Sequence, residues 1–435
     1  MSLLRRWLDP IRSRWYYQQP HRQETLSVDG GLAIYLRLDD VYSYLAVQTL
    51  AQLDDILSDE LRPLKIIISD QMSEPPNGMS LEAWQQYCFQ DAKILAKQHR
   101  FAFDEFPEAP QAEALAQAQS ILRLTPLRGQ EFLYLLEDIF HMLWQQQYGK
   151  LRTLYALVTQ RHQAAEYPER IFTDQPVLVS YFEWAERKYH AVDDLLRLTR
   201  RLKQQKLLKG NPIFLINHIE WREHLMTDME ELTEIQALHP ELDLYIALED
   251  PISWLLLAYI KTQLADYYNI QLRIFPLSYQ KRDFFDWSLA SRLSKRAEVA
   301  FTPFCRPDAA AVEQIAQLFF SLEEEDRVEG LYEILQAVWR RGKDLSYAPH
   351  VNALKQKLAL DHLISIDEAQ QHLAEHDEIA QHKAQPNLPI LELRIAEQTY
   401  TFNSLYRVWM IESIFSNVLE EKYQQDAEAE KAASR

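Results

Sequence analysis

Cysteine and glycine are both scarce in this chain of 435 residues. Its 2 cysteines, Cys88 and Cys305, lie far apart and form no C-x-x-C motif, so a redox dithiol motif is absent and a disulfide framework is excluded. With only 8 glycines, the close backbone approach of a phosphate-binding loop is not expected. The N-terminus has no apolar run of signal-peptide or membrane-span length, so we expect no signal peptide, no spanning helix and a cytoplasmic location.

Basic residues are also few relative to acidic ones, so that the formal net charge is -18. This balance argues against nucleic acid or an anionic membrane as the main partner. The length predicts two or three domains, and a hydrophobic content of 47% is enough to form their cores. We interpret residues 1–31 as an N-terminal arm. It would either pack on the body or lie on a membrane surface, since several apolar residues could share one helical face: Leu3, Leu4, Trp7, Ile11 and Trp15.

One stretch of the chain occurs twice. Residues 34–50 read IYLRLDDVYSYLAVQTL, and residues 244–260 read LYIALEDPISWLLLAYI. Each is a strand-like alternation that runs through an acidic pair, ending in Asp40 or Asp250, into a helix-like segment. A strand that ends at a helix N-terminus is a common place for chemistry, because the first helical turn presents free N–H groups and positive dipole.

The elements around this stretch also repeat. In the first half we expect strands at 32–38 and 64–70, helices at 42–58, 80–100, 111–123, 127–163 and 177–208, a hairpin after a Gly-Asn-Pro turn at 209–221, and a helix at 223–236. In the second half we expect strands at 243–248 and 270–276, helices at 252–267, 284–296, 308–321, 326–341, 347–358 and 366–383, a hairpin at 387–402, and a helix at 403–423.

This order predicts an α/β (α+β) chain of two tandem thioredoxin-like domains, each with an all-helical insertion. A β-α-β unit followed by a β-β-α unit is the thioredoxin layout. We place the domains at 32–236 and 243–425, with a boundary at 237–242 where Pro240 breaks a helix, and a charged, frayed tail at 426–435.

Three motifs, in the same order in both halves, give the chain a family resemblance. They are DVYSYL (40–45) and DPISWL (250–255) after the first strand, a Trp-Gly motif at 139–150 and 335–345, and GNPIF (210–214) and NLPIL (387–391) before the hairpin. The chain therefore resembles the DsbA-like thioredoxin superfamily, and within it the branch of 2-hydroxychromene-2-carboxylate isomerase and kappa-class glutathione transferase.

The resemblance implies the following sites. An active member of the branch would isomerise a hydrophobic substrate or conjugate it with glutathione. It would use residues at the N-terminus of the first helix, here Asp40, Tyr42, Ser43, Asp250 and Ser253. Glutathione would contact the turn before the hairpin and the segment after it, which are represented by Asn211, Pro212, Leu388, Pro389, Glu223 and His224. The family's proline is cis, so we expect cis Asn211–Pro212 and Leu388–Pro389 bonds.

The chain departs from the branch at one position in each half. The family carries Cys or Ser where this chain has Asp40 and Asp250, and a carboxylate would repel a thiolate there. Each aspartate is a candidate general acid or base, but we favour an N-cap that accepts the first-turn N–H bonds. His218, Glu223 and His224 are too poorly spaced to predict a metal site. Two functions stay open: a glutathione-dependent isomerase or transferase, and a catalytically degenerate tandem binding or scaffold protein.

Overall fold

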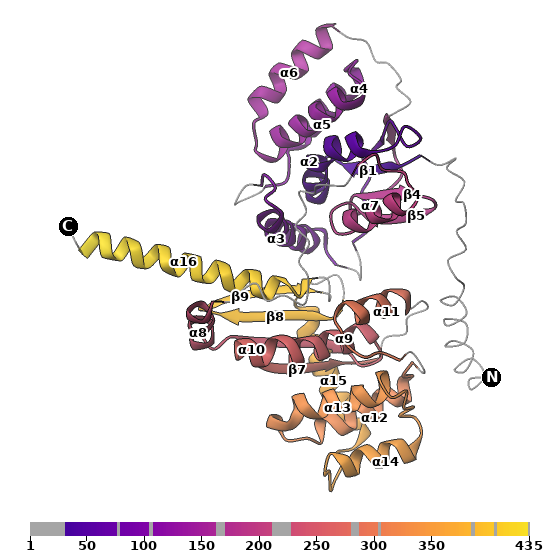
Figure 1. Cartoon of the computed structure of the whole chain (residues 1–435), viewed down its shortest axis with the longest axis vertical. Coiled ribbons are helices and arrows are strands. Elements are labelled where there is room, and N and C mark those ends of the chain that lie inside the picture. Colours follow the sequence, from indigo (N-terminus) through magenta and orange to yellow (C-terminus); the bar gives the residue numbers. More distant parts are fainter. Residues whose placement is uncertain are drawn as a thin grey trace. The chain divides into compact units, whose positions relative to one another are not determined.

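The computed structural model describes residues 31–75, 79–103, 108–161, 170–210, 228–279, 287–302, 306–383, 388–403 and 407–433. These residues form two compact units, 31–210 and 228–433, each of which is described by itself (Figure 1). The N-terminal arm lies outside the described residues, apart from Gly31.

The first unit opens with the predicted β-α-β arrangement. Strand β1 (Ala33–Arg37) leads into helix α2 (Val41–Ile56), and β2 (Lys65–Ser69) then pairs parallel with β1. Ile34 and Leu36 of β1 and Ile66 and Ile68 of β2 are fully or almost fully buried, as expected for one face of a sheet that packs against helices. The helical block follows in α3 (Leu81–His99), α4 (Ala112–Leu124), α5 (Gly129–Trp144) and α6 (Tyr148–Arg161).

The hairpin of the first unit lies earlier in the chain than predicted. Residues 177–208 are not one helix, because they form β4 (Tyr181–Trp184), β5 (Arg187–His190) and only then α7 (Leu195–Gln204). Phe182, Trp184 and Tyr189 alternate with polar residues at period two and are buried. Ala185 and Glu186 adopt positive φ at the turn, a conformation of two-residue hairpin loops that their helix-favouring types do not signal. The hairpin expected at 213–221 lies outside the described residues.

A strand that the sequence did not predict completes this sheet. Strand β3 (Arg170–Thr173) pairs parallel with β2 and gives the order β3-β2-β1-β4-β5.

The second unit follows the prediction more closely. Strands β6 (Glu241–Ala247) and β7 (Gln271–Leu277) are parallel, and the helix between them comprises α9 (Pro251–Tyr259), a π-helical turn (Ile260–Ala265) and α10 (Asp266–Tyr268). The helical block consists of α11 (Trp287–Arg296), α12 (Ala309–Phe320), α13 (Arg327–Trp339), α14 (Ala348–Lys357) and α15 (Ile366–Gln381). Hairpin strands β8 (Ile390–Ile395) and β9 (Gln398–Asn403) complete the sheet in the order β7-β6-β8-β9.

Two terminal elements differ from the prediction. Helix α8 (Met229–Ala237) belongs to the second unit, where Glu234 forms an ion pair of 2.7 Å with Lys422 of α16 (Met410–Ala433). The sequence analysis instead placed this helix before a boundary at 237–242, because Pro240 breaks the helix there. The tail at 426–435 is helical as far as Ala433, since its many Ala, Glu and Lys residues favour helix.

The two sheets share a core pattern. The order β2-β1-β4-β5 in the first unit corresponds to β7-β6-β8-β9 in the second, with one parallel pair and one antiparallel hairpin in each. The registers align residue by residue, because Tyr35 faces Tyr181 in the first unit and Tyr245 faces Ile390 in the second. Each unit is thus an α/β fold with the thioredoxin-like layout.

None of the helices in the described part of the chain combines the length and apolar character that a membrane span requires.

Candidate functional site

The carboxylate of Asp40 caps the N-terminus of α2. Its backbone is extended (φ -98°, ψ 119°), as an N-cap residue requires. The backbone N–H groups of Tyr42 and Ser43 donate to it at 3.3 and 2.9 Å, and the Ser43 hydroxyl donates at 2.7 Å. Ser43 in turn accepts the N–H of Arg37 at 3.0 Å. Ser43 therefore ties the end of β1 to the start of α2.

Ser180 adds a fourth donor to Asp40 from across the sheet. Its backbone N–H lies 3.0 Å from Asp40 Oδ2. Ser180 directly precedes Tyr181, as Pro389 directly precedes Ile390, so the aligned registers put Ser180 at the position of Pro389. The first unit therefore has a Ser where a cis-proline was expected. Pro212, which the sequence analysis assigned to this position, lies outside the described residues.

Burial and hydrogen bonding act on Asp40 in opposite directions. The side chain lies in the protein interior, with only 5% of the residue exposed. Burial raises the pKa of the Asp40 carboxyl above its ordinary value, although the nearby Arg37 guanidinium and the bonds from Ser43 and Ser180 act to lower it. The four donors are arranged to hold an acceptor in place, which is the work of a cap.

Arg37 is a buried cation at the same turn. Its guanidinium donates to both carboxylate oxygens of Asp39 at 2.9 and 2.8 Å, and to the carbonyl oxygens of Val177 and Leu178 at 2.9 and 3.2 Å. These bonds join β1 to the segment that leads into β4. They also hold Asp39 beside the guanidinium, so the acidic pair is not left as two uncompensated charges.

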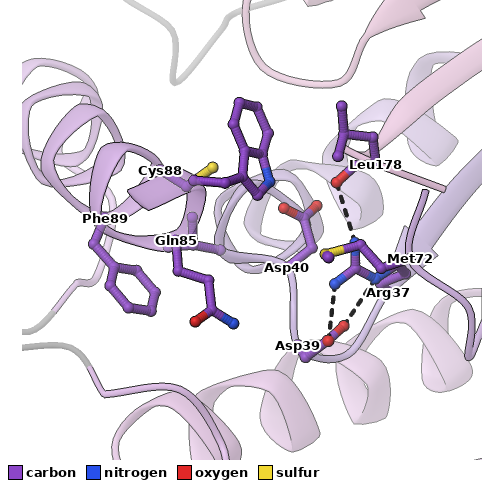
Figure 2. A pocket seen from close by; sticks show the side chains of 10 residues that line it. Arg37, Asp39, Asp40, Met72, Gln85, Cys88, Phe89 and Leu178 are labelled. Carbon is purple, nitrogen blue, oxygen red and sulfur yellow. Dashed lines mark hydrogen bonds and ion pairs between the residues drawn. The ribbon is translucent and has the colours of Figure 1, made fainter. Parts of the chain in front are cut away.

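A pocket opens beside this acidic pair (Figure 2). It is a small, open hollow with room for about one water molecule. Its lining joins the turn after β1 to α3 and to the segments at 72 and 178, and consists of Arg37, Asp39, Asp40, Val41, Met72, Trp84, Gln85, Cys88, Phe89 and Leu178. Polar and apolar groups share the lining about equally, and the charged groups of Arg37, Asp39 and Asp40 lie on one side.

A buried hydrogen-bonded pair, Tyr42 and Asp91, lies beside Cys88 of the pocket lining. The Tyr42 hydroxyl donates to Asp91 of α3 at 2.7 Å, and both residues are buried. Cys88 of α3 is a buried free thiol. Burial raises the pKa of this thiol far above its ordinary value, and the charges of Asp40 and Asp91 add to the effect. Cys88 is therefore held as a neutral thiol, not as the thiolate that nucleophilic or redox chemistry needs.

Asp250 repeats the cap in the second unit. Its backbone (φ -99°, ψ 118°) matches that of Asp40, and it accepts the N–H of Ile252 at 3.1 Å and the Ser253 hydroxyl at 3.4 Å. Asp250 and Ser253 are almost fully buried. The prediction that both aspartates cap equivalent helices is confirmed. The Leu388–Pro389 bond is cis, as predicted, and the Arg62–Pro63 bond is also cis.

The structure brings together only some of the predicted site residues. Asp40, Tyr42 and Ser43 gather at one helix start, and Asp250 and Ser253 at the other. Asn211, Pro212, Glu223 and His224 lie outside the described residues. The sequence analysis missed Arg37, Asp91 and Ser180, which lie in β1, in α3 and in the segment just before β4. A charged residue inside the strand pattern was the signal for Arg37, whereas no local pattern marks the others.

Metal ligands do not cluster in this part of the protein. Across the described residues, no group of three or more His, Cys, Asp or Glu side chains could hold a metal ion.

Comparisons with known proteins give structural matches and no sequence matches. No protein-family model and no curated protein matches this sequence. A 2-hydroxychromene-2-carboxylate isomerase structure is similar at 14% identity and a TM-score of 0.33, covering 42% of this chain and 98% of its own. The cytosolic disulfide reductase DsbM from Pseudomonas aeruginosa is similar at 14% identity and a TM-score of 0.31, covering 42% of this chain and 99% of its own. The same reductase also matches in a structure with GSH. At these scores the matches carry no argument about activity, and the thioredoxin-like layout rests on the strand order of the two sheets.

Proposed function

We propose that this chain is a tandem thioredoxin-fold protein that acts by binding, as a recognition or scaffold module, and not by thiol chemistry. One observation carries the proposal: in both units a buried aspartate fills the N-terminus of the first helix, where the DsbA-like families place the reacting Cys or the Ser that stabilises glutathione. The same feature occurs twice, so it is not an isolated substitution.

The electrostatics of the cap support this proposal. A helix N-terminus stabilises a thiolate through its free N–H groups and its dipole. In the first unit those groups already bond to Asp40 at 2.9 and 3.3 Å. An incoming thiolate would lose these donors and would also meet a carboxylate, which raises its pKa instead of lowering it. Burial is the main cause of the raised pKa of the nearby Cys88 thiol, and the Asp40 charge adds to it in the direction expected for an incoming thiol.

A glutathione-dependent isomerase or transferase is the second candidate. The apolar wall of the pocket favours it, because Met72, Trp84 and Phe89 offer a hydrophobic surface next to the turn at Asp40. In this mechanism glutathione would bind beside the cap, and the carboxyl group, with its pKa raised by burial, would move a proton on the substrate.

Calorimetric titration of the full chain with glutathione distinguishes the two candidates. We expect no binding heat for the native chain. We expect binding to appear in Asp40→Ser, which restores the family's hydroxyl and removes the repelling charge. Asp250→Ser is the matched control, because it makes the same exchange in the other unit and leaves the first pocket unaltered. Glutathione binding by the native chain that Asp40→Ala abolishes would support the enzyme and overturn the binding-module proposal.

A further inference from the structure

One segment of the first unit carries charge of the opposite sign to the rest of the chain. Residues 187–209 contain 8 basic and 2 acidic residues, a charge of +6 in a chain of -18. The part of the same unit that precedes it, residues 31–186, contains 12 basic and 22 acidic residues. The segment comprises β5, α7 and the turn after α7, and α7 lies against the β4–β5 hairpin (Figure 1). The positive charge of the unit is therefore concentrated at one place in the fold.

Helix α7 is amphipathic, and its apolar side is already used within the unit. Leu195, Leu198 and Leu202 are buried, whereas Arg197 and Arg200 are exposed on the opposite side. The apolar side is therefore not open to a membrane or to a partner helix. The basic side is the part of α7 that an external partner can reach.

The hairpin adds a further arginine next to this side of α7. Trp184 and Arg187 are direct partners across the β4–β5 turn, so their side chains point to the same face of the sheet. The guanidinium of Arg201 lies over the same Trp184 ring, 5.7 Å from its centre. Arg187 and Arg201 thus lie beside one ring. We call Arg187, Arg197, Arg200 and Arg201 the arginine face.

Two of these guanidinium groups are held in place by buried aromatic residues. Arg201 Nη1 donates to the Tyr189 hydroxyl at 3.1 Å, and the Arg197 guanidinium lies 5.4 Å from the centre of the Tyr189 ring. Tyr189 is completely buried, so it is a rigid support. A guanidinium that is fixed against an aromatic ring loses less freedom when it binds an anion.

Acidic side chains of the first unit leave most of this charge uncompensated. Arg197 forms an i,i+3 ion pair with Asp194 at 3.4 Å. Among the residues that the structure describes, Arg187 and Arg200 form no ion pair, and the interactions of Arg201 are with aromatic residues. Four positive charges gathered in this way repel one another, and an anionic partner would relieve the repulsion.

The size of the arginine face favours a short anion. Helix α7 has 10 residues and is therefore about 15 Å long. A nucleic acid or an anionic membrane extends much further, and at physiological salt, where screening takes about 8 Å, it would meet the acidic remainder of the unit. A peptide of about five extended residues covers the same 15 Å. Its carboxylates match the planar fork of arginine, which binds them through two parallel hydrogen bonds.

We propose that the arginine face binds a short acidic segment of a partner protein, about five residues long and rich in Asp and Glu. The carboxylates of the segment pair with Arg187, Arg197, Arg200 and Arg201. The lining of the pocket at Asp40 includes none of these arginines, so the inference goes beyond the proposed function and stands or falls independently of it.

Fluorescence anisotropy of a fluorescein-labelled hexaglutamate peptide, titrated with the full chain, tests the proposal. We expect saturable binding by the native chain and roughly tenfold weaker binding by Arg200→Glu, because the substitution replaces an attraction with a repulsion. Arg152→Glu is the matched control, since it makes the same charge change at an exposed arginine of α6 and should bind like the native chain. A labelled hexaglutamine peptide should not bind.

Two further measurements separate recognition from other effects of these substitutions. The denaturant midpoint of Arg200→Glu should equal that of the native chain, because Arg200 is exposed and outside the core. Arg201→Lys keeps the charge and removes the fork, so it should bind the peptide roughly threefold more weakly. Unchanged affinity in Arg201→Lys would contradict pairing through arginine forks.

Three results would overturn the proposal. The first is the absence of saturable hexaglutamate binding to the native chain. The second is equal affinity of the native chain and Arg200→Glu. The third is tighter binding of a short single-stranded DNA, or of vesicles that contain phosphatidylserine, when that binding is lost in Arg200→Glu and retained in Arg152→Glu. This last result would assign the arginine face to a phosphate-bearing partner.

Discussion

At the scale of the residue, Asp40 combines two properties that compete. It satisfies backbone donors that would otherwise be unpaired at a helix start, and it keeps a carboxyl group in the protein interior. Asp250 combines the same two properties, and its backbone angles are nearly identical to those of Asp40. The units differ in the residue just before the first hairpin strand. Ser180 donates its backbone N–H to Asp40, whereas Pro389 at the corresponding position has no N–H to donate.

The first prediction is that Asp40→Ala lowers the free energy of unfolding by about 0.5–2 kcal/mol, the cost of losing an N-cap. Denaturant melts of the two proteins measure this difference. Asp174→Ala is the control at an exposed aspartate that caps no helix; it should cost less. An unchanged midpoint for Asp40→Ala would contradict the cap.

The second prediction concerns His376, which packs on Phe275 at 5.1 Å and hydrogen-bonds the Pro276 carbonyl at 3.0 Å. Burial lowers the pKa of His376. The charges of His372 and Arg327 add to this effect, whereas the hydrogen bond to Pro276 and the charge of Glu375 oppose it. The unfolded chain therefore binds the proton more tightly, and stability should fall as the pH drops from about 7 to 5. His376→Phe should flatten this fall, as measured by chemical denaturation at each pH. His362→Gln, at an exposed histidine, is the control, and an unaltered slope in His376→Phe would contradict the assignment.

At the scale of the element, charged residues connect three strands of the second sheet. Asp243 of β6 is buried and accepts bonds from Arg273 of β7 at 2.8 and 3.0 Å and from Arg394 of β8 at 2.8 and 2.9 Å. Arg394 also bonds Glu241 and Glu392. This group sits across the middle of the sheet and favours one strand register over a slip of one residue, which would separate the charges.

The third prediction follows from the pKa of Asp243. Burial raises this pKa, but the bonds from Arg394 and Arg273 outweigh burial, and the net pKa is lowered. The stabilisation is therefore complete above the ordinary pKa near 4 and is lost as the pH falls below it. Asp243→Asn should lower the free energy of unfolding at pH 7 and weaken its acid dependence. Glu397→Gln, in the β8–β9 turn, is the matched control. Acid unfolding of Asp243→Asn that overlays the native curve would count against this account.

At the scale of the whole molecule, the repeat of strand, acidic turn and helix predicted both units and the position of both caps. The α/β class and most helices of the second unit are as expected, because their apolar spacing is strong. The hairpin at 181–190 was missed because Ala185, Glu186 and Arg187 favour helix, so the period-two pattern of Phe182 and Trp184 was outweighed. Arg37, Cys88 and Ser180 meet only through tertiary packing, which no local pattern encodes.

The fourth prediction applies to the chain as a whole: it should not catalyse reduction of insulin by a dithiol. Aspartate stands at the attacking position in both units, and the Cys88 pKa is raised. The measurement is the rate of insulin reduction compared with the uncatalysed rate, and Cys88→Ala is the matched control. Robust turnover by the native chain would contradict this prediction.

The cap also has a consequence for competition between ligands. Asp40 is covalently tethered to the helix that it caps, so any external anion competes with an intramolecular one. Even a short flexible tether gives an effective concentration of the order of mM, and Asp40 is fixed in place by four donors. A soluble thiolate would therefore need a comparable or higher concentration merely to displace it. The helix start in each unit behaves as an anion site that is permanently inhibited by its own chain.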